Sequence, residues 1–189
     1  MTTKNSTLVS NFEASPQAMN AAHQLHGVKR IAQGTIALAT GDLDLNDLVM
    51  LAPIPSNASI TSIKLASDDL DSDGSPALAF NVGLHNTDGT VADADAYASA
   101  ITLGQAATVF TEYAFEARNI NACGRQVWAD ALATADTKKL YYVSMTVSTA
   151  AATAAAGDLS FQIEYVVNSD KSGASPGAPL HHARRMRRD

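Results

Sequence analysis

The sequence has little of several features that define common protein classes. Cys123 is its one cysteine, so no disulfide can form within the chain, and burial of apolar side chains must supply the stability. No apolar run approaches the roughly 20 residues that a membrane-spanning helix needs. The start of the chain has neither the basic nor the apolar region of a signal peptide, so we expect synthesis in the cytoplasm and no membrane partner.

Basic residues are scarce in the middle of the chain. Between residues 42 and 117 there are twelve carboxylates, and Lys64 is the one Lys or Arg. The net charge of the chain is −6. Affinity for phosphates requires clustered Lys and Arg, so we expect no nucleic-acid partner for this acidic body. Residues 168–189 have the opposite balance and end in an Arg-rich stretch, which we interpret as a solvated tail; contact with nucleic acid or an acidic protein surface is the alternative.

Motifs that carry catalysis are also missing. The sequence contains no G-x-S-x-G, no phosphate-binding loop, no G-x-G-x-x-G and no Cys-rich metal pattern. No His and carboxylate pair is recognisable around Cys123, which is expected to be inert packing. The five histidines are scattered, and solvated or interfacial positions are expected for them. We therefore expect a protein that is not an enzyme and needs no cofactor.

Alternation of apolar and polar residues predicts eight short strands. Leu78–His85 is the clearest case, because Leu78, Phe80, Val82 and Leu84 share one face. Asp88-Gly89 is the strongest turn signal. A helical turn is expected at 126–133, where Trp128 and Leu132 could together cap one end of the core. The predicted strands are 30–39, 48–54, 59–66, 78–85, 97–103, 108–116, 140–147 and 159–167.

These strands predict an all-β fold, an antiparallel β-sandwich of jelly-roll type, with an immunoglobulin-like sandwich as the alternative. Residues 28–167 would form this one domain. Residues 1–27 would be an N-terminal arm or a short helix, with Ser15 and Pro16 starting the helix and Gly27 ending it. Residues 168–189 would be a flexible basic tail.

The loop DDLDSDG at 68–74 is the best candidate for a cation site. Asp69, Asp71 and Asp73 precede Gly74, and calcium prefers several oxygen ligands on a tight loop. An EF-hand is excluded, because Phe80 stands where that motif needs a Glu. A looser calcium loop remains as a weak candidate, and Asp residues that form Asx turns are the alternative. No other metal site is expected.

Several segments in sequence order resemble phage virion proteins. They are LHGVKRIAQGTIAL (25–38), LAPIPSNASITSIKLASDDL (51–70), NVGLHNTDG (81–89), VADADAYASAI (91–101), YAFEARNI (113–120) and VWADAL (127–132). Together they resemble the head decoration, or capsid cement, proteins of tailed phages.

This resemblance implies a structural protein on the capsid surface of the virion. Its partner would be the major capsid protein, and it would form a homo-oligomer, with a trimer favoured over a dimer. The alternative function is a virion fibre or adhesin-type domain that binds a host surface glycan. We expect residues 1–30 to carry the contacts with the capsid or between subunits, and the candidate residues are Phe12, Met19, Leu25, Val28 and Arg30.

Overall fold

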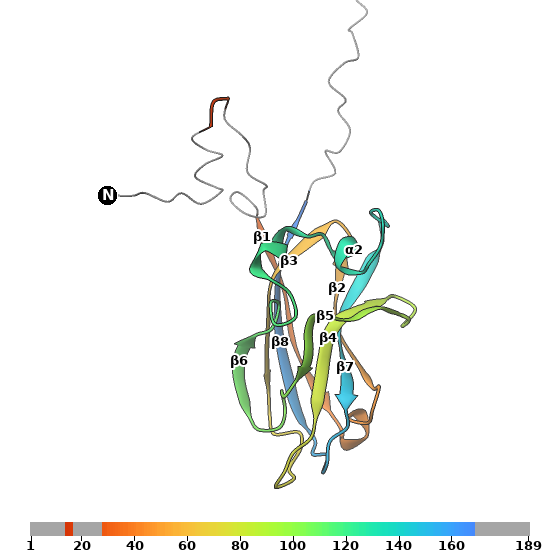
Figure 1. Ribbon diagram of the computed structural model, residues 1–189. Coiled ribbons are helices and arrows are strands. Elements are labelled where there is room, and N and C mark those ends of the chain that lie inside the picture. Colours follow the sequence, from red (N-terminus) through yellow and green to blue (C-terminus); the bar gives the residue numbers. More distant parts are fainter. Residues whose placement is uncertain (1–13, 17–27, 169–189) are drawn as a thin grey trace, which may run out of the picture.

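Residues 14–16 and 28–168 are described by the computed structural model, and they form a two-layered β-sandwich (Figure 1). The segments expected at 1–27 and 168–189 lie almost wholly outside these residues. The strands are β1 (Lys29–Leu38), β2 (Leu48–Pro55), β3 (Ala58–Ser67), β4 (Ala79–Asn86), β5 (Val91–Ile101), β6 (Thr108–Glu112), β7 (Leu140–Thr149) and β8 (Gly157–Val167). The helical segments are η1 (Thr40–Asp42), η2 (Ile120–Gly124) and α2 (Val127–Asp130).

The strands pair in a nested, antiparallel pattern. β1 pairs with β8, β2 with β7, β3 with β6, and β4 with β5. Pairs β3–β8 and β4–β7 join them into two sheets, ordered β1-β8-β3-β6 and β2-β7-β4-β5. One long hairpin rolled into two four-stranded sheets is a jelly roll, so the predicted fold class is confirmed. The immunoglobulin-like alternative is wrong, because that fold divides its strands differently.

Apolar and polar residues alternate along each central strand, so the side chains of one face are buried in the core. On β7, Tyr141, Val143, Met145 and Val147 are all buried. The facing residues of β8 are Leu159, Phe161 and Ile163, and these are buried too. Burial of these side chains between the sheets is the main stabilising contribution in a chain that has no disulfide.

Two predicted strand boundaries are wrong. β5 begins at Val91 rather than at 97, because its pairing with β4 shifts register three times and so gives no clean alternation. β6 ends at Glu112 rather than at 116. There the Glu112 carboxylate accepts hydrogen bonds from the backbone N–H groups of Ile63 and Ala114, both at 2.8 Å, and the chain leaves the sheet.

The irregular strand β5 lies against one face of β4. A side chain at Gly83 would place its Cβ only 2.2 Å from the carbonyl oxygen of Asp93, so only glycine fits at that position. His85 stands on the same face and is fully buried, and its Nδ1 lies 2.6 Å from the hydroxyl of Ser144. The expectation of a solvated or interfacial histidine is wrong for His85, because the irregularity of β5 could not be read from the sequence.

The sandwich has two ends of different character (Figure 1). We call one the helical end; it comprises residues 28–30, the 55–58 turn, the long 113–140 connection with η2 and α2, and residue 168. We call the other the acidic end; it comprises the connections 39–47, 68–78, 102–107 and 150–156. Val28 and Asn168 both lie at the helical end, so both chain segments outside the described residues join the sandwich there.

Candidate docking surface at the helical end

The long 113–140 connection crosses the helical end and forms a covering layer over the core. Val127 and Ala131 face inward and are buried. The predicted pair of Trp128 and Leu132 is wrong: Leu132 is 71% exposed, because α2 ends at Asp130 and the backbone of Leu132 adopts a φ of 58°. The helical turn therefore exists but presents a different face to the core.

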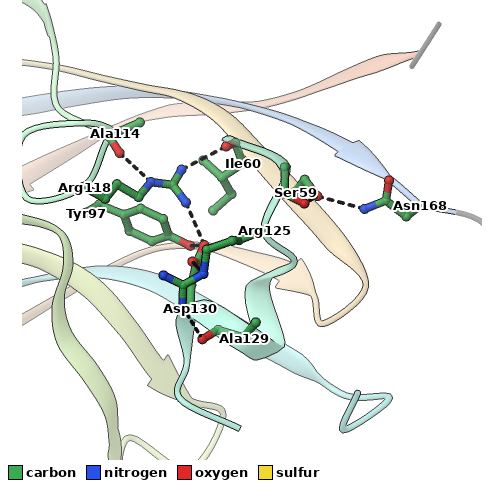
Figure 2. Close-up of polar contacts among 10 residues, drawn as sticks. Ser59, Ile60, Tyr97, Ala114, Arg118, Arg125, Ala129, Asp130 and Asn168 are labelled. Atoms are coloured by element: carbon green, nitrogen blue, oxygen red, sulfur yellow. Dashed lines mark hydrogen bonds and ion pairs between the residues drawn. The ribbon is translucent and has the colours of Figure 1, made fainter. Parts of the chain in front are cut away.

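Arg118 anchors this layer from below (Figure 2). Its side chain is only 6% exposed. The guanidinium donates to the carbonyl of Ala114 at 2.7 Å, to the carbonyl of Ile60 at 2.9 Å and to the carboxylate of Asp130 at 2.8 Å. It also lies over the ring of Tyr97, 4.5 Å from its centroid. One side chain thus connects β3, β5, the 113–118 segment and α2.

Asp130 is the acceptor on which this cluster converges. It receives the hydroxyl of Tyr97 at 3.3 Å, and Arg125 lies 3.3 Å from its second oxygen (Figure 2). Burial raises the pKa of Asp130, and the charges of Arg118 and Arg125 offset only part of that rise. Burial also raises the pKa of Tyr97 well above its ordinary value, so this hydroxyl stays protonated and donates.

A second set of hydrogen bonds fixes the 55–58 turn to the covering layer. The backbone N–H of Trp128 donates to the carbonyl of Ser56 at 3.0 Å, and the backbone N–H of Ser56 donates to the carbonyl of Lys139 at 2.8 Å. Asn168 donates from its side chain to the hydroxyl of Ser59 at 2.8 Å (Figure 2). The surface of the helical end therefore rests on a rigid base.

That surface combines exposed apolar side chains with basic ones. Six of the seven Lys and Arg residues between 28 and 168 lie at this end, and five of them are at the surface because Arg118 is buried; the 113–140 connection also contains Glu116, Asp130 and Asp136. The large apolar side chains exposed here are Val28, Ile120, Leu132 and Leu140. Exposed apolar groups gathered within a polar surround are typical of protein interaction sites. A hollow of about 310 Å³ lies beside Leu140, and its lining also includes Pro55, Asp136, Lys138 and Lys139.

Two of the contact residues predicted from the sequence lie at this surface. Val28 is 80% exposed, and Arg30 is exposed beside it. Phe12, Met19 and Leu25 lie outside the described residues. The role of all five stays a prediction.

The candidate calcium loop lies at the acidic end, far from this surface. The carboxylate of Asp71 is buried and accepts four backbone N–H groups, from Ala77, Leu78, Ala152 and Thr153. Burial raises the pKa of Asp71, but these four donors lower it more, so its net pKa lies well below its ordinary value.

The other two carboxylates of that loop do not converge with Asp71. Asp69 accepts from the backbone N–H of Asp71 at 3.2 Å, and Asp73 accepts from the backbone N–H of Ser75 at 2.8 Å. Within residues 14–16 and 28–168, no group of three His, Cys, Asp or Glu residues is placed to hold a metal ion. Asp71 therefore connects the 68–74 loop to residues 152 and 153 through hydrogen bonds.

Sequence reasoning missed the Arg118–Asp130 pair. The two residues are twelve positions apart in a segment expected to be partly strand and partly helix, and no spacing rule joins them. The one available signal was YAFEARNI, a charged residue among aromatics, which is typical of a cation stacked on rings. Cys123 is half-buried, and burial raises the pKa of its thiol.

Comparisons place the fold among phage capsid structures. A chain in the capsid asymmetric unit of cyanophage Pam1 is 25% identical with a TM-score of 0.54; the alignment covers 82% of this chain and 97% of that one. A chain in the capsid of Ralstonia phage GP4 is 23% identical with a TM-score of 0.58, over 76% of this chain and 86% of that one. No family model and no curated protein matches the sequence.

The Pam1 alignment takes in nearly the whole of the neighbouring chain, so the likeness is not to one domain of a much longer capsid protein. The resemblance to phage virion proteins is thus confirmed at the level of a capsid-associated structural protein. Both neighbours are capsid chains, which argues against an enzyme and indicates a place in the virion. None of the helices among the described residues is long and apolar enough to cross a membrane.

Proposed function

We propose that this protein binds the outer surface of the assembled phage capsid through its helical end and stabilises the shell, as a decoration or cement protein. The observation that carries the proposal is the difference in side-chain composition between the two ends of the sandwich. Apolar and basic side chains gather at one end, and the connections of the other end hold seven Asp residues and no Lys or Arg. Such a difference suits a molecule that binds a surface with one end and faces solvent with the other.

The helical end suits a surface that is partly apolar and acidic. Lys138 and Arg30 form no ion pair among the described residues, so each can pair with a carboxylate of the partner. Leu132 and Val28 supply apolar area, and the anchored covering layer keeps them from reorganising on binding, which limits the entropy cost. The partner on the shell would be the major capsid protein.

The acidic end would then face solvent. A high density of one charge on the outside of a particle repels other particles and keeps them apart in solution. Binding only to the intact shell also stabilises it by mass action, because rupture requires the bound protein to be released.

The experiment is co-sedimentation with purified mature capsids that lack this protein, followed by heating of the particles. We expect saturable binding at a fixed ratio to capsid subunits and a higher rupture temperature. Absence of binding, with the protein found instead at the tail or fibres of intact virions, would refute the proposal and favour the glycan-binding alternative.

A matched pair of variants tests the helical end itself. Leu132→Glu places a carboxylate on the proposed surface, and Leu45→Glu places one at the acidic end, where Leu45 is 58% exposed. We expect Leu132→Glu to weaken capsid binding at least about tenfold, which corresponds to about 1.4 kcal/mol. Leu45→Glu should bind as the wild type does; equal losses in both variants would show that the helical end is not the docking surface.

A further inference from the structure

The outer face of the sheet β1-β8-β3-β6 carries a hollow lined by uncharged polar side chains and one aromatic ring. Phe161 of β8 is buried in the core, so its alternate neighbours Ser160 and Gln162 point away from the core. A hollow of about 410 Å³ lies over them. Its lining comprises Gln33, Gly34, Thr35, Phe110, Ser160, Phe161 and Gln162.

A second hollow of about 280 Å³ adjoins the first on the same sheet. Its lining comprises Ala66, Ser67, Asp68, Thr108, Asp158 and Ser160. Ser160 lines both hollows, and its register partners are Thr35 on β1 and Ala66 on β3. The two hollows therefore form one groove across the sheet, which we call the sheet groove, and its second part lies nearer the acidic end.

The sheet groove offers both donors and acceptors of hydrogen bonds. The hydroxyls of Thr35 and Ser160 lie 2.9 Å apart, and the Gln162 amide donates to the side-chain oxygen of Gln33 at 3.4 Å. Within residues 28–168, the amide nitrogen of Gln33, the side-chain oxygen of Gln162 and the carboxylate of Asp158 make no other hydrogen bond. These groups are therefore available to a ligand.

Phe110 supplies an apolar surface to this polar groove. It lies on β6 and is 55% exposed. An exposed aromatic ring beside amides, hydroxyls and a carboxylate matches the two sides of a sugar. The C–H face of a sugar ring packs on an aromatic ring, and its hydroxyls bond to amide and carboxylate groups. Jelly rolls also occur as lectin domains.

Other classes of ligand fit the sheet groove less well. Neither lining contains Lys or Arg, and Asp68 and Asp158 would repel phosphates. Lys64 lies in register with Gln162, but Glu112 stands opposite it on β6. A peptide that adds a strand needs an open edge, whereas β8 and β3 are inner strands of the sheet. Among the described residues, no three His, Cys, Asp or Glu side chains are placed to hold a cation.

We propose that the sheet groove binds a neutral glycan. Phe110 stacks on one sugar ring, and Gln33 and Gln162 bond to its hydroxyls. Asp158 accepts from the hydroxyls of the next sugar. This site is separate from the helical end, so in contrast to the fibre or adhesin alternative it can bind a glycan while the helical end is docked on a shell. An open groove binds weakly, and many copies on one particle would raise the avidity; this last step alone rests on the proposed function.

The test is saturation-transfer difference NMR on the full-length protein. The probes are four neutral oligosaccharides (maltotetraose, cellotetraose, mannotetraose and N-acetylchitotetraose), with sialyllactose as the charged control. We expect signals from at least one neutral probe and none from sialyllactose. Phe110→Ala should raise the dissociation constant at least about tenfold, which corresponds to about 1.4 kcal/mol. Val109→Ala is the matched control, because Val109 is 83% exposed on the same strand but does not line the groove.

Gln162→Ala provides a second variant that decides the question if Phe110→Ala fails to fold, and it should also weaken binding. Absence of signal from all four neutral probes, equal binding of sialyllactose, or unchanged binding in the folded variants would each overturn the proposal. Phe110→Ala should still co-sediment with capsids, and Leu132→Glu should still bind the oligosaccharide. Failure of the glycan site can thus be told apart from failure of capsid binding.

Discussion

The buried ion pair between Arg118 and Asp130 offers the most quantitative test of how the helical end is held. Asp130→Ala leaves the Arg118 guanidinium inside the protein without its carboxylate, and removal of one partner of a buried pair costs about 3–5 kcal/mol. Arg118→Met should cost a similar amount, because Asp130 and the carbonyls of Ala114 and Ile60 all lose their donor.

The double variant, with both Arg118→Met and Asp130→Ala, measures the free energy of interaction between the two side chains. Once both charges are gone, neither is left uncompensated, so the combined loss should fall short of the sum of the single losses by about 2–3 kcal/mol. The assay is urea unfolding of all four proteins, in which the midpoint changes and the slope stays constant.

Arg125→Met is the matched control for this cycle. Arg125 pairs with the same carboxylate, but its side chain is 49% exposed. An ion pair screened to that degree contributes less than about 1 kcal/mol. Additive losses in the double variant, or a loss in Arg125→Met equal to that in Arg118→Met, would refute the assignment of Arg118 as the anchor.

Two further predictions concern single polar residues and pH. Oδ2 of Asp71 accepts three of the four hydrogen bonds and Oδ1 accepts one, so Asp71→Asn removes the charge and at least one accepted hydrogen bond and should cost about 2–3 kcal/mol. Because the pKa of Asp71 is depressed in the fold, its contribution is complete above the unfolded value of about 3.9 and is lost progressively below it. Thermal unfolding at pH 3 and pH 7 should therefore show a larger drop in stability for the wild type than for Asp71→Asn, and equal drops would contradict this. Burial lowers the pKa of His85, so the unfolded chain binds a proton that the folded one rejects, and stability should fall as the pH drops below about 6.5. His85→Gln should flatten that dependence between pH 7 and pH 5, and a wild-type slope retained in the variant would show that other groups cause it.

The sequence by itself determined the class of fold and most of its strands. The period-2 alternation of β4, β7 and β8 is strong because one face of each is buried, and a one-residue slip would turn every apolar side chain outward. The turn residues between the strands are equally local, as at Asp88-Gly89, where Gly89 has a φ of 84°. Signals of this kind depend only on neighbouring residues, so they can be recognised from the sequence alone.

Only the tertiary structure decided where the irregular elements lie and what the polar side chains do. The shifts in β5, the burial of His85 and the exposure of Leu132 all follow from contacts between segments distant in sequence. Asp71 was indistinguishable from Asp69 and Asp73 until the loop at 152 and 153 was seen to supply two of its donors. The same is true of the proposed docking surface, because the 55–58 turn and the 113–140 connection meet only in the folded sandwich. Alternation along a strand is a local property, but the residues that contact a given charged side chain are set by the path of the whole chain.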